Sequence, residues 1–182
     1  MNENKKVIIA EIVSAVAIIL LGSLFHFLYE WTECTAIGIF SPVNESEWEH
    51  IKIMFYPVIL VSIIEYFFIR YDVNNYVFAK AISALVFIAT TYLLIYLYEL
   101  IFGEGEMALH VVTYIVGAFV GQLISYLILR RSNSSKSKCK NLIGYYIFLF
   151  VFLIITLFTF RPLQCDFFRD STTGYYGIPP KS

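Results

Sequence analysis

Charged residues are scarce in this chain, and their scarcity excludes most soluble folds. Only 15% of the 182 residues are Asp, Glu, Lys or Arg, against about 25% in an average soluble domain. Hydrophobic residues make up 59% of the chain, and the mean hydropathy is +0.72. A disordered protein is excluded as well, because disorder needs low hydrophobicity and high net charge. The composition indicates an integral membrane protein.

The chain also lacks an excess of basic residues and the common catalytic motifs. Its formal net charge is −1, which argues against nucleic-acid binding, because such proteins carry a basic surface. Three cysteines are too few for a disulfide framework, although Cys34 and Cys165 could pair with each other. The patterns C-x-x-C, H-E-x-x-H and G-x-S-x-G do not occur, so no motif by itself predicts a catalytic site.

Long apolar runs are abundant. A hydrocarbon core about 30 Å thick needs roughly 20 apolar residues in a helix. Five segments reach that length, at about residues 7–29, 50–69, 77–98, 107–129 and 142–160. The sequence therefore predicts an all-α fold, in which residues 1–182 form one domain with five transmembrane helices in the lipid bilayer.

Basic residues between these segments and near their ends predict the orientation, because Lys and Arg concentrate in cytoplasmic loops. One side of the predicted bundle carries nine of them: Lys5, Lys6, Arg70, Lys80, Arg130, Arg131, Lys136, Lys138 and Lys140. The other side carries four: Lys52, Arg161, Arg169 and Lys181. We therefore expect the N-terminus and the basic loop 130–140 in the cytoplasm. The tail 161–182 is then outside, where we expect it to fold back over the nearby acidic residues.

Histidine and carboxylate meet at the predicted outer side. His26, His50 and His110 all map to the outer end of a helix, each with a glutamate three or four residues away. Residues at these spacings share a helix face. Neutral imidazoles and carboxylates suit zinc, iron or manganese. The predicted ligands of such a divalent metal are His26, His50, His110, Glu30, Glu47 and Glu106.

The same acidic residues also have a structural interpretation. Ser41 and Pro42 are typical of a turn, and Asn44 is then the predicted cap of the second helix, with Glu47 as its capping-box partner. Acidic residues in a first helical turn also favour the positive end of the helix dipole. The histidines can likewise have separate structural roles.

Two further features concern the membrane interior. Glu11 and Glu65 lie near the inner helix ends, where we expect them to snorkel to the interface. The alternative is an ion pair, of Glu65 with Arg70 and of Glu11 with a lysine from another segment. Gly117 and Gly121 form a G-x-x-x-G pattern, which predicts close helix packing. We favour packing within the chain, with a homo-oligomer through these glycines as the alternative.

Three stretches together resemble an uncharacterised family of small bacterial multi-pass membrane proteins. They are His26-Phe27-Leu28-Tyr29-Glu30-Trp31, the segment from Phe40 to His50 with its PVNES-x-WEH pattern, and Thr172-Thr173-Gly174-Tyr175-Tyr176-Gly177. The resemblance covers nearly the whole chain. It implies a location in the bacterial cytoplasmic membrane and no assigned activity.

The sequence leaves three functions open. The first is a membrane-embedded metal-dependent hydrolase, in which a metal-bound water attacks the substrate and Glu30 or Glu49 is the general base. The second is a protein that binds or transports a metal or protons. The third is an accessory membrane protein with no site chemistry, whose histidines can be replaced without effect.

Overall fold

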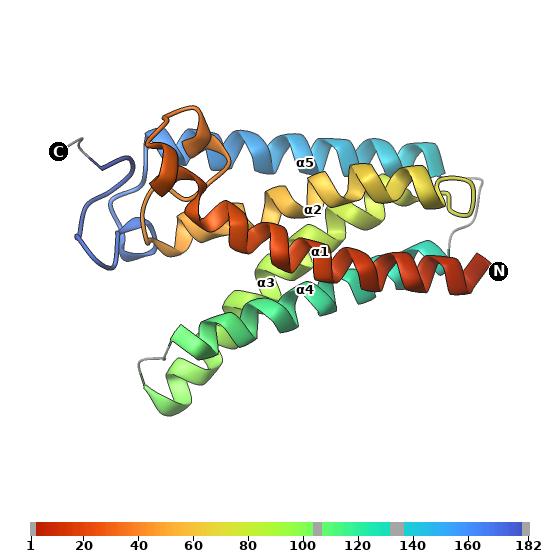
Figure 1. The fold of residues 1–182 in the computed structure, drawn as a ribbon, viewed down its shortest axis with the longest axis horizontal. Helices are drawn as coiled ribbons and strands as arrows, with labels where there is room; N and C mark the ends of the chain where they lie inside the picture. Colours follow the sequence, from red (N-terminus) through yellow and green to blue (C-terminus); the bar gives the residue numbers. More distant parts are fainter. Residues whose placement is uncertain (1–2, 104–106, 132–136, 180–182) are drawn as a thin grey trace.

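The described residues of the chain fold into five long α-helices (Figure 1). The computed structural model describes residues 3–103, 107–131 and 137–179. The helices are α1 (Glu3–Thr32), α2 (Glu47–Ile69), α3 (Tyr76–Phe102), α4 (Met107–Arg130) and α5 (Ser137–Phe160), and two short 3-10 turns are η1 (Ile37–Ile39) and η3 (Asp166–Phe168). These ranges contain no β-strand, and the predicted all-α fold class is confirmed.

Each of these five helices is long and apolar enough to cross a membrane. The lengths of 23 to 30 residues exceed the roughly 20 that a bilayer requires. The prediction of a five-helix membrane protein is therefore confirmed, whereas which side is cytoplasmic stays a prediction. The beginning of α1 and the tail after α5 lie at opposite ends of the bundle (Figure 1).

Helix α2 is the most enclosed of the five. Its side chains Met54, Phe55 and Val58 are at most 2% exposed and pack into an apolar core with Ile18 of α1 and Phe87 of α3. A run of apolar residues without a polar face, as in α2, is typical of a helix surrounded by others. This core fills the middle of the bundle.

Helices α3 and α4 pack closely through the predicted small residues. A Cβ atom built on Gly121 would lie 2.9 Å from the carbonyl oxygen of Ser83, and one on Gly117 would overlap the hydroxyl of Thr91. Only glycine lets the two backbones approach this closely. Both glycines therefore contact α3 of the same chain, and an oligomer through them stays a prediction.

One end of the bundle is covered by a cap, which we define as residues 33–46 together with the tail 161–179. The tail lies against the start of α2: Ser171 donates to the carbonyl of Glu45 (3.1 Å), and Asn44 donates to the carbonyl of Gly177 (2.8 Å). The rings of Trp48 and Phe168 stack with centroids 4.7 Å apart. The prediction that the tail folds back is confirmed.

Two local predictions are wrong. The cap residue of α2 is Ser46 and not Asn44, since the Ser46 hydroxyl accepts from the amide of Glu49 (3.3 Å). Asn44 instead accepts from the amide of Ser46 (2.9 Å), which orders the turn before the helix. Glu11 and Glu65 do not snorkel, because each is at most 5% exposed and pairs with Lys80.

Candidate metal site

Three potential metal ligands converge where α1, the cap and α2 meet. The Nε2 atoms of His26 and His50 lie 3.2 Å apart. An Oε2 atom of Glu45 lies 3.4 Å from His50 Nε2 and 3.9 Å from His26 Nε2. Among the described residues, this is the one group of three or more His, Cys, Asp or Glu side chains close enough to share an ion.

His26 is held by the attachment of the cap to α1. The hydroxyl of Ser41 donates to the carbonyl of Phe25 (2.5 Å) and accepts from the amide of Tyr29 (2.9 Å). In a regular helix these two backbone groups bond to each other. Ser41 thus bonds to both groups of this pair beside His26 and attaches the cap to α1 near the imidazole.

His50 is oriented by the first turn of its own helix. Its Nδ1 atom lies 2.7 Å from the carbonyl oxygen of Ser46, and a carbonyl can only accept. Nδ1 therefore carries a proton, which leaves Nε2 as the ring nitrogen that could bind a metal. Metal-binding histidines are commonly oriented in this way by a carbonyl behind the ring.

Glu45 reaches the site from the loop before α2. When His50 is also protonated at Nε2, it donates to Glu45, and this hydrogen bond holds the pKa of the Glu45 carboxyl below its ordinary value, against the opposing effect of burial. The anion that this hydrogen bond favours is the form of a carboxylate that binds a metal, and His50 would lose its Nε2 proton when the metal binds. Its side chain is 45% exposed, so the site opens to the surface.

A hollow of about 560 Å³ adjoins this open side. It is bounded by Glu45, by Glu47 at the start of α2, and by tail residues that include Asp166, Arg169 and Asp170. Its walls are mainly polar and acidic. A substrate or a hydrated cation therefore has room beside Glu45, the candidate ligand that lines this hollow.

The spacing of the three ligand atoms fits a small metal ion. Metal–nitrogen bonds of about 2.0–2.1 Å place the ligands of a tetrahedral zinc about 3.3 Å apart. Two of the observed separations, 3.2 Å and 3.4 Å, match that value, and the third is 3.9 Å. Three protein ligands leave a position open for water or substrate, as in catalytic zinc sites. Two histidines and one carboxylate are also a known ligand set for iron(II).

The other residues predicted for the site lie elsewhere or have other partners. Glu49 is buried and pairs with Lys52, and it also accepts from the amide of Val43 (2.9 Å). Glu47 accepts a hydrogen bond from Tyr96, and Glu30 is exposed one turn beyond His26. Glu106 lies outside the described residues.

His110 is not brought to the group. It lies near the start of α4, where its Nε2 atom is 3.9 Å from a carboxylate oxygen of Glu99. The end of α3 and the start of α4 diverge from the cap, so they carry His110 away from the other two histidines (Figure 1).

Glu45 is a candidate ligand that the sequence did not predict. The predicted ligands were chosen by helical spacing, and Glu45 lies in the loop before the cap residue of α2, where helical spacing does not apply. Ser46 could have indicated Glu45, because the residue just before a helix cap lies close to the first helical turn, which here carries His50.

Comparisons with known proteins give one match. The family model described as "Family of unknown function (DUF6512)" matches residues 1–178. No curated protein and no solved structure matches the chain. The match covers nearly the whole chain and confirms the predicted resemblance to an uncharacterised family.

Proposed function

The chain belongs to this family of unknown function, DUF6512, and we propose that it is a membrane-embedded metal-dependent hydrolase. In this proposal His26, Glu45 and His50 bind a divalent transition metal, such as zinc, iron or manganese. The observation that carries the proposal is the convergence of two imidazole Nε2 atoms at 3.2 Å, with a carboxylate oxygen 3.4 Å from one of them. Without a metal, the same 3.2 Å separation is a hydrogen bond between the two imidazoles, in which the ring that carries a proton on Nε2 is the donor.

Hydrolysis is supported by the open side of the ligand group. A metal bound by three protein ligands lowers the pKa of its water to about 7, which supplies a hydroxide nucleophile at neutral pH. The hollow beside Glu45 gives a substrate access from the membrane surface. Glu49 is a poor candidate for the general base, because Lys52 holds its carboxylate. Glu30, which is exposed, remains the candidate base.

Transport of the metal is the alternative, and it has less support. A carrier needs a polar path across the bilayer. The 15 residues from Glu11 to His26 span about 22 Å of helix. Over this length α1 packs into the apolar core around Ile18 and Phe55. Binding and catalysis at one membrane face need no such path.

Metal content tests the proposed site. The protein, purified in detergent without a histidine tag, should carry about one metal per chain after loading with zinc, iron or manganese. His50→Ala and Glu45→Ala should lower the affinity at least tenfold. His110→Ala is the matched control, since it removes an imidazole outside the group. Absence of bound metal after loading, or equal loss in the control, would contradict the proposal.

Hydrolysis needs its own assay. We would present carboxylic ester and phosphodiester probes in mixed micelles to the metal-loaded protein. Activity that disappears with a chelator and in His50→Ala, but persists in His110→Ala, would support the hydrolase. Stoichiometric metal without turnover of any probe class would instead favour the metal-binding or carrier alternative.

A further inference from the structure

A second polar group lies inside the bundle, toward the end opposite the cap. The ammonium of Lys80 on α3 lies 2.8 Å from a carboxylate oxygen of Glu11 on α1. It also lies 2.5 Å from a carboxylate oxygen of Glu65 on α2. All three side chains are buried: Glu11 is 3% exposed, Lys80 is 1% exposed and Glu65 is 5% exposed. Ionisable residues at this depth in a membrane protein commonly mark function.

The remaining partners come from helices α2, α3 and α4. Lys80 donates to Gln122 (3.0 Å), and Ser125 donates to Glu11 (2.7 Å). Tyr76 donates to Glu65 (3.0 Å) and to the backbone carbonyl of Ser62 (2.6 Å). No other charged side chain is recorded in contact with the trio among the described residues. The titratable groups that face one another are therefore Glu11, Glu65, Lys80 and Tyr76.

The charges of this group do not balance when all of its members are ionised. Two carboxylates face one ammonium, and a buried charge without a counter-charge is strongly unfavourable. The Oε1 atom of Glu65 is buried and has no hydrogen-bond partner. Two carboxylates that share one site ionise together only with difficulty. One bound proton would neutralise the group and remove the unpaired charge at Glu65.

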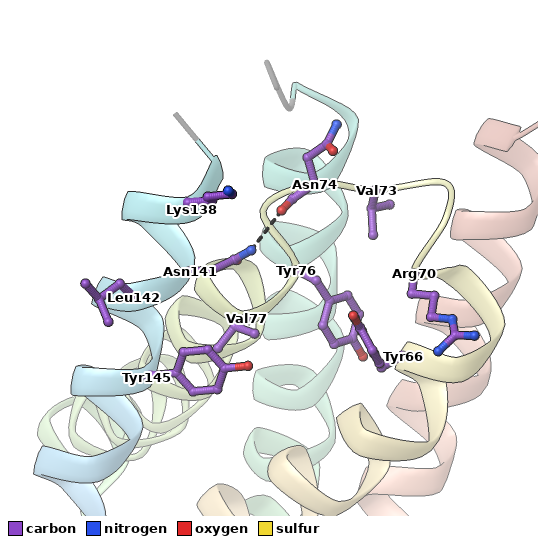
Figure 2. A pocket seen from close by; sticks show the side chains of 10 residues that line it. All are labelled: Tyr66, Arg70, Val73, Asn74, Tyr76, Val77, Lys138, Asn141, Leu142 and Tyr145. Atoms are coloured by element: carbon purple, nitrogen blue, oxygen red, sulfur yellow. Dashed lines mark hydrogen bonds between the residues drawn. The ribbon is translucent and has the colours of Figure 1, made fainter. Parts of the chain in front are cut away.

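A hollow of about 340 Å³ lies beside this group, with Tyr76 in its lining. The hollow lies between the α2–α3 loop and the beginning of α5, where Asn141 donates to the carbonyl of Asn74 (Figure 2). Arg70, which follows α2, and Lys138 of α5 also line it. Because the Tyr76 hydroxyl bonds to Glu65, it connects the hollow with the buried carboxylates.

We propose that Glu11, Glu65 and Lys80 form a proton-binding site inside the membrane, in which the two carboxylates share one proton. The proton comes from water in the hollow beside Tyr76 and returns there. It forms an O–H bond with one carboxylate oxygen, while the other carboxylate keeps its ion pair with Lys80. The site is independent of the proposed metal centre.

Infrared difference spectroscopy of the protein reconstituted in lipid vesicles tests this site. At about pH 7 a free glutamate is ionised, so the C=O band of a carboxylic acid reports only a glutamate that keeps its proton in the folded protein. From the shared proton we expect the band of one protonated carboxylic acid per chain in the native protein. Glu65→Gln leaves one carboxylate with one ammonium, so the band should disappear. Lys80→Met removes the ammonium, so the band should increase.

Glu30→Gln is the matched control, since it removes an exposed carboxylate from the same bundle. The control should leave the band unchanged. Absence of a protonated carboxyl band in the native protein at about pH 7 would overturn the proposal, whether or not the variants fold. A native band that persists in folded Glu65→Gln and Glu11→Gln would overturn it as well.

Discussion

The buried pair of Lys52 and Glu49 holds the cap on the bundle, and its removal should destabilise the protein strongly. The side chains are 0% and 2% exposed. Lys52 also donates to the backbone carbonyl of Gly38 (2.5 Å). Glu49 accepts from the amide of Val43 and from the hydroxyl of Thr159 on α5 (3.3 Å). One ion pair thus joins the cap to both α2 and α5.

The magnitude follows from what each substitution leaves behind. Glu49→Gln leaves the ammonium of Lys52 buried without its counter-charge, which typically costs 3–5 kcal/mol, and we expect about 3 kcal/mol because Gln can still accept from Val43. Glu49→Ala also leaves the buried amide of Val43 without an acceptor and should cost about 1–3 kcal/mol more. The double variant Glu49→Gln with Lys52→Met should recover part of the loss, because it removes the buried ammonium that the single variant leaves without a counter-charge.

Reversible unfolding in mixed detergent micelles, followed by circular dichroism, measures these differences. The control is Glu30→Gln, an exposed carboxylate that should change the free energy of unfolding by at most about 0.5 kcal/mol. A Glu49→Gln variant as stable as the native protein would refute the reasoning. So would a double variant that is less stable than the single one.

Three further predictions concern the cap and the helix packing. Burial raises the pKa of Asp170, but hydrogen bonds from Thr173 and Thr172 outweigh it and hold the pKa below its ordinary value. The ionised Asp170 therefore contributes its whole stabilisation above about pH 3.9, the pKa of an unfolded Asp. This contribution is lost as the pH falls through the lower pKa that Asp170 has in the folded protein. Hydrogen exchange of the tail amides should accelerate over that acid range, and Asp170→Asn should remove the transition. Asn44→Ala removes the bond to the Gly177 carbonyl and should make the tail more sensitive to protease, whereas unchanged cleavage would contradict this contact. Gly121→Val places a side chain against the α3 backbone and should cost at least about 1–3 kcal/mol of unfolding free energy, while the exposed Val116→Leu should be near neutral.

The helices were predictable because hydropathy reports them directly. Each span needs only a continuous apolar run, and a run of that length has few alternatives to a membrane helix. The tail was predictable because its aromatic and turn residues differ from those of a disordered end. The exact cap of α2 was not, since Asn44 and Ser46 are both good capping residues and only the packing of the tail decides between them.

The two lysines show where sequence reasoning about charge fails. Lys52 and Lys80 were counted among the loop residues that predict the orientation. In the structure each is at most 1% exposed and pairs with a glutamate. The partner Glu11 is 69 residues away from Lys80 along the chain. Hydropathy records that such charges exist, but it does not record which helix carries the counter-charge. Only the packing of α1 against α4, and of α4 against α3, reveals the pair.

The candidate site was predictable in part. His26 and His50 were identified because histidine is rare in this chain and both map to one end of the bundle. The third histidine was grouped with them on the same reasoning, although α3 and α4 diverge from the cap. The number of residues between helices does not determine the angle at which they cross, so the sequence could not separate His110 from the other two.

X-ray absorption of the metal-loaded protein tests the central claim most directly, because it reports the atoms bound to the metal. With zinc, we predict a first shell of nitrogen and oxygen at about 2.0–2.1 Å, with the scattering pattern of two imidazoles. His26→Ala should reduce that pattern to one imidazole, and His110→Ala should leave it unchanged. A metal shell without imidazole, or a shell that depends on His110, would contradict a centre built from His26, Glu45 and His50.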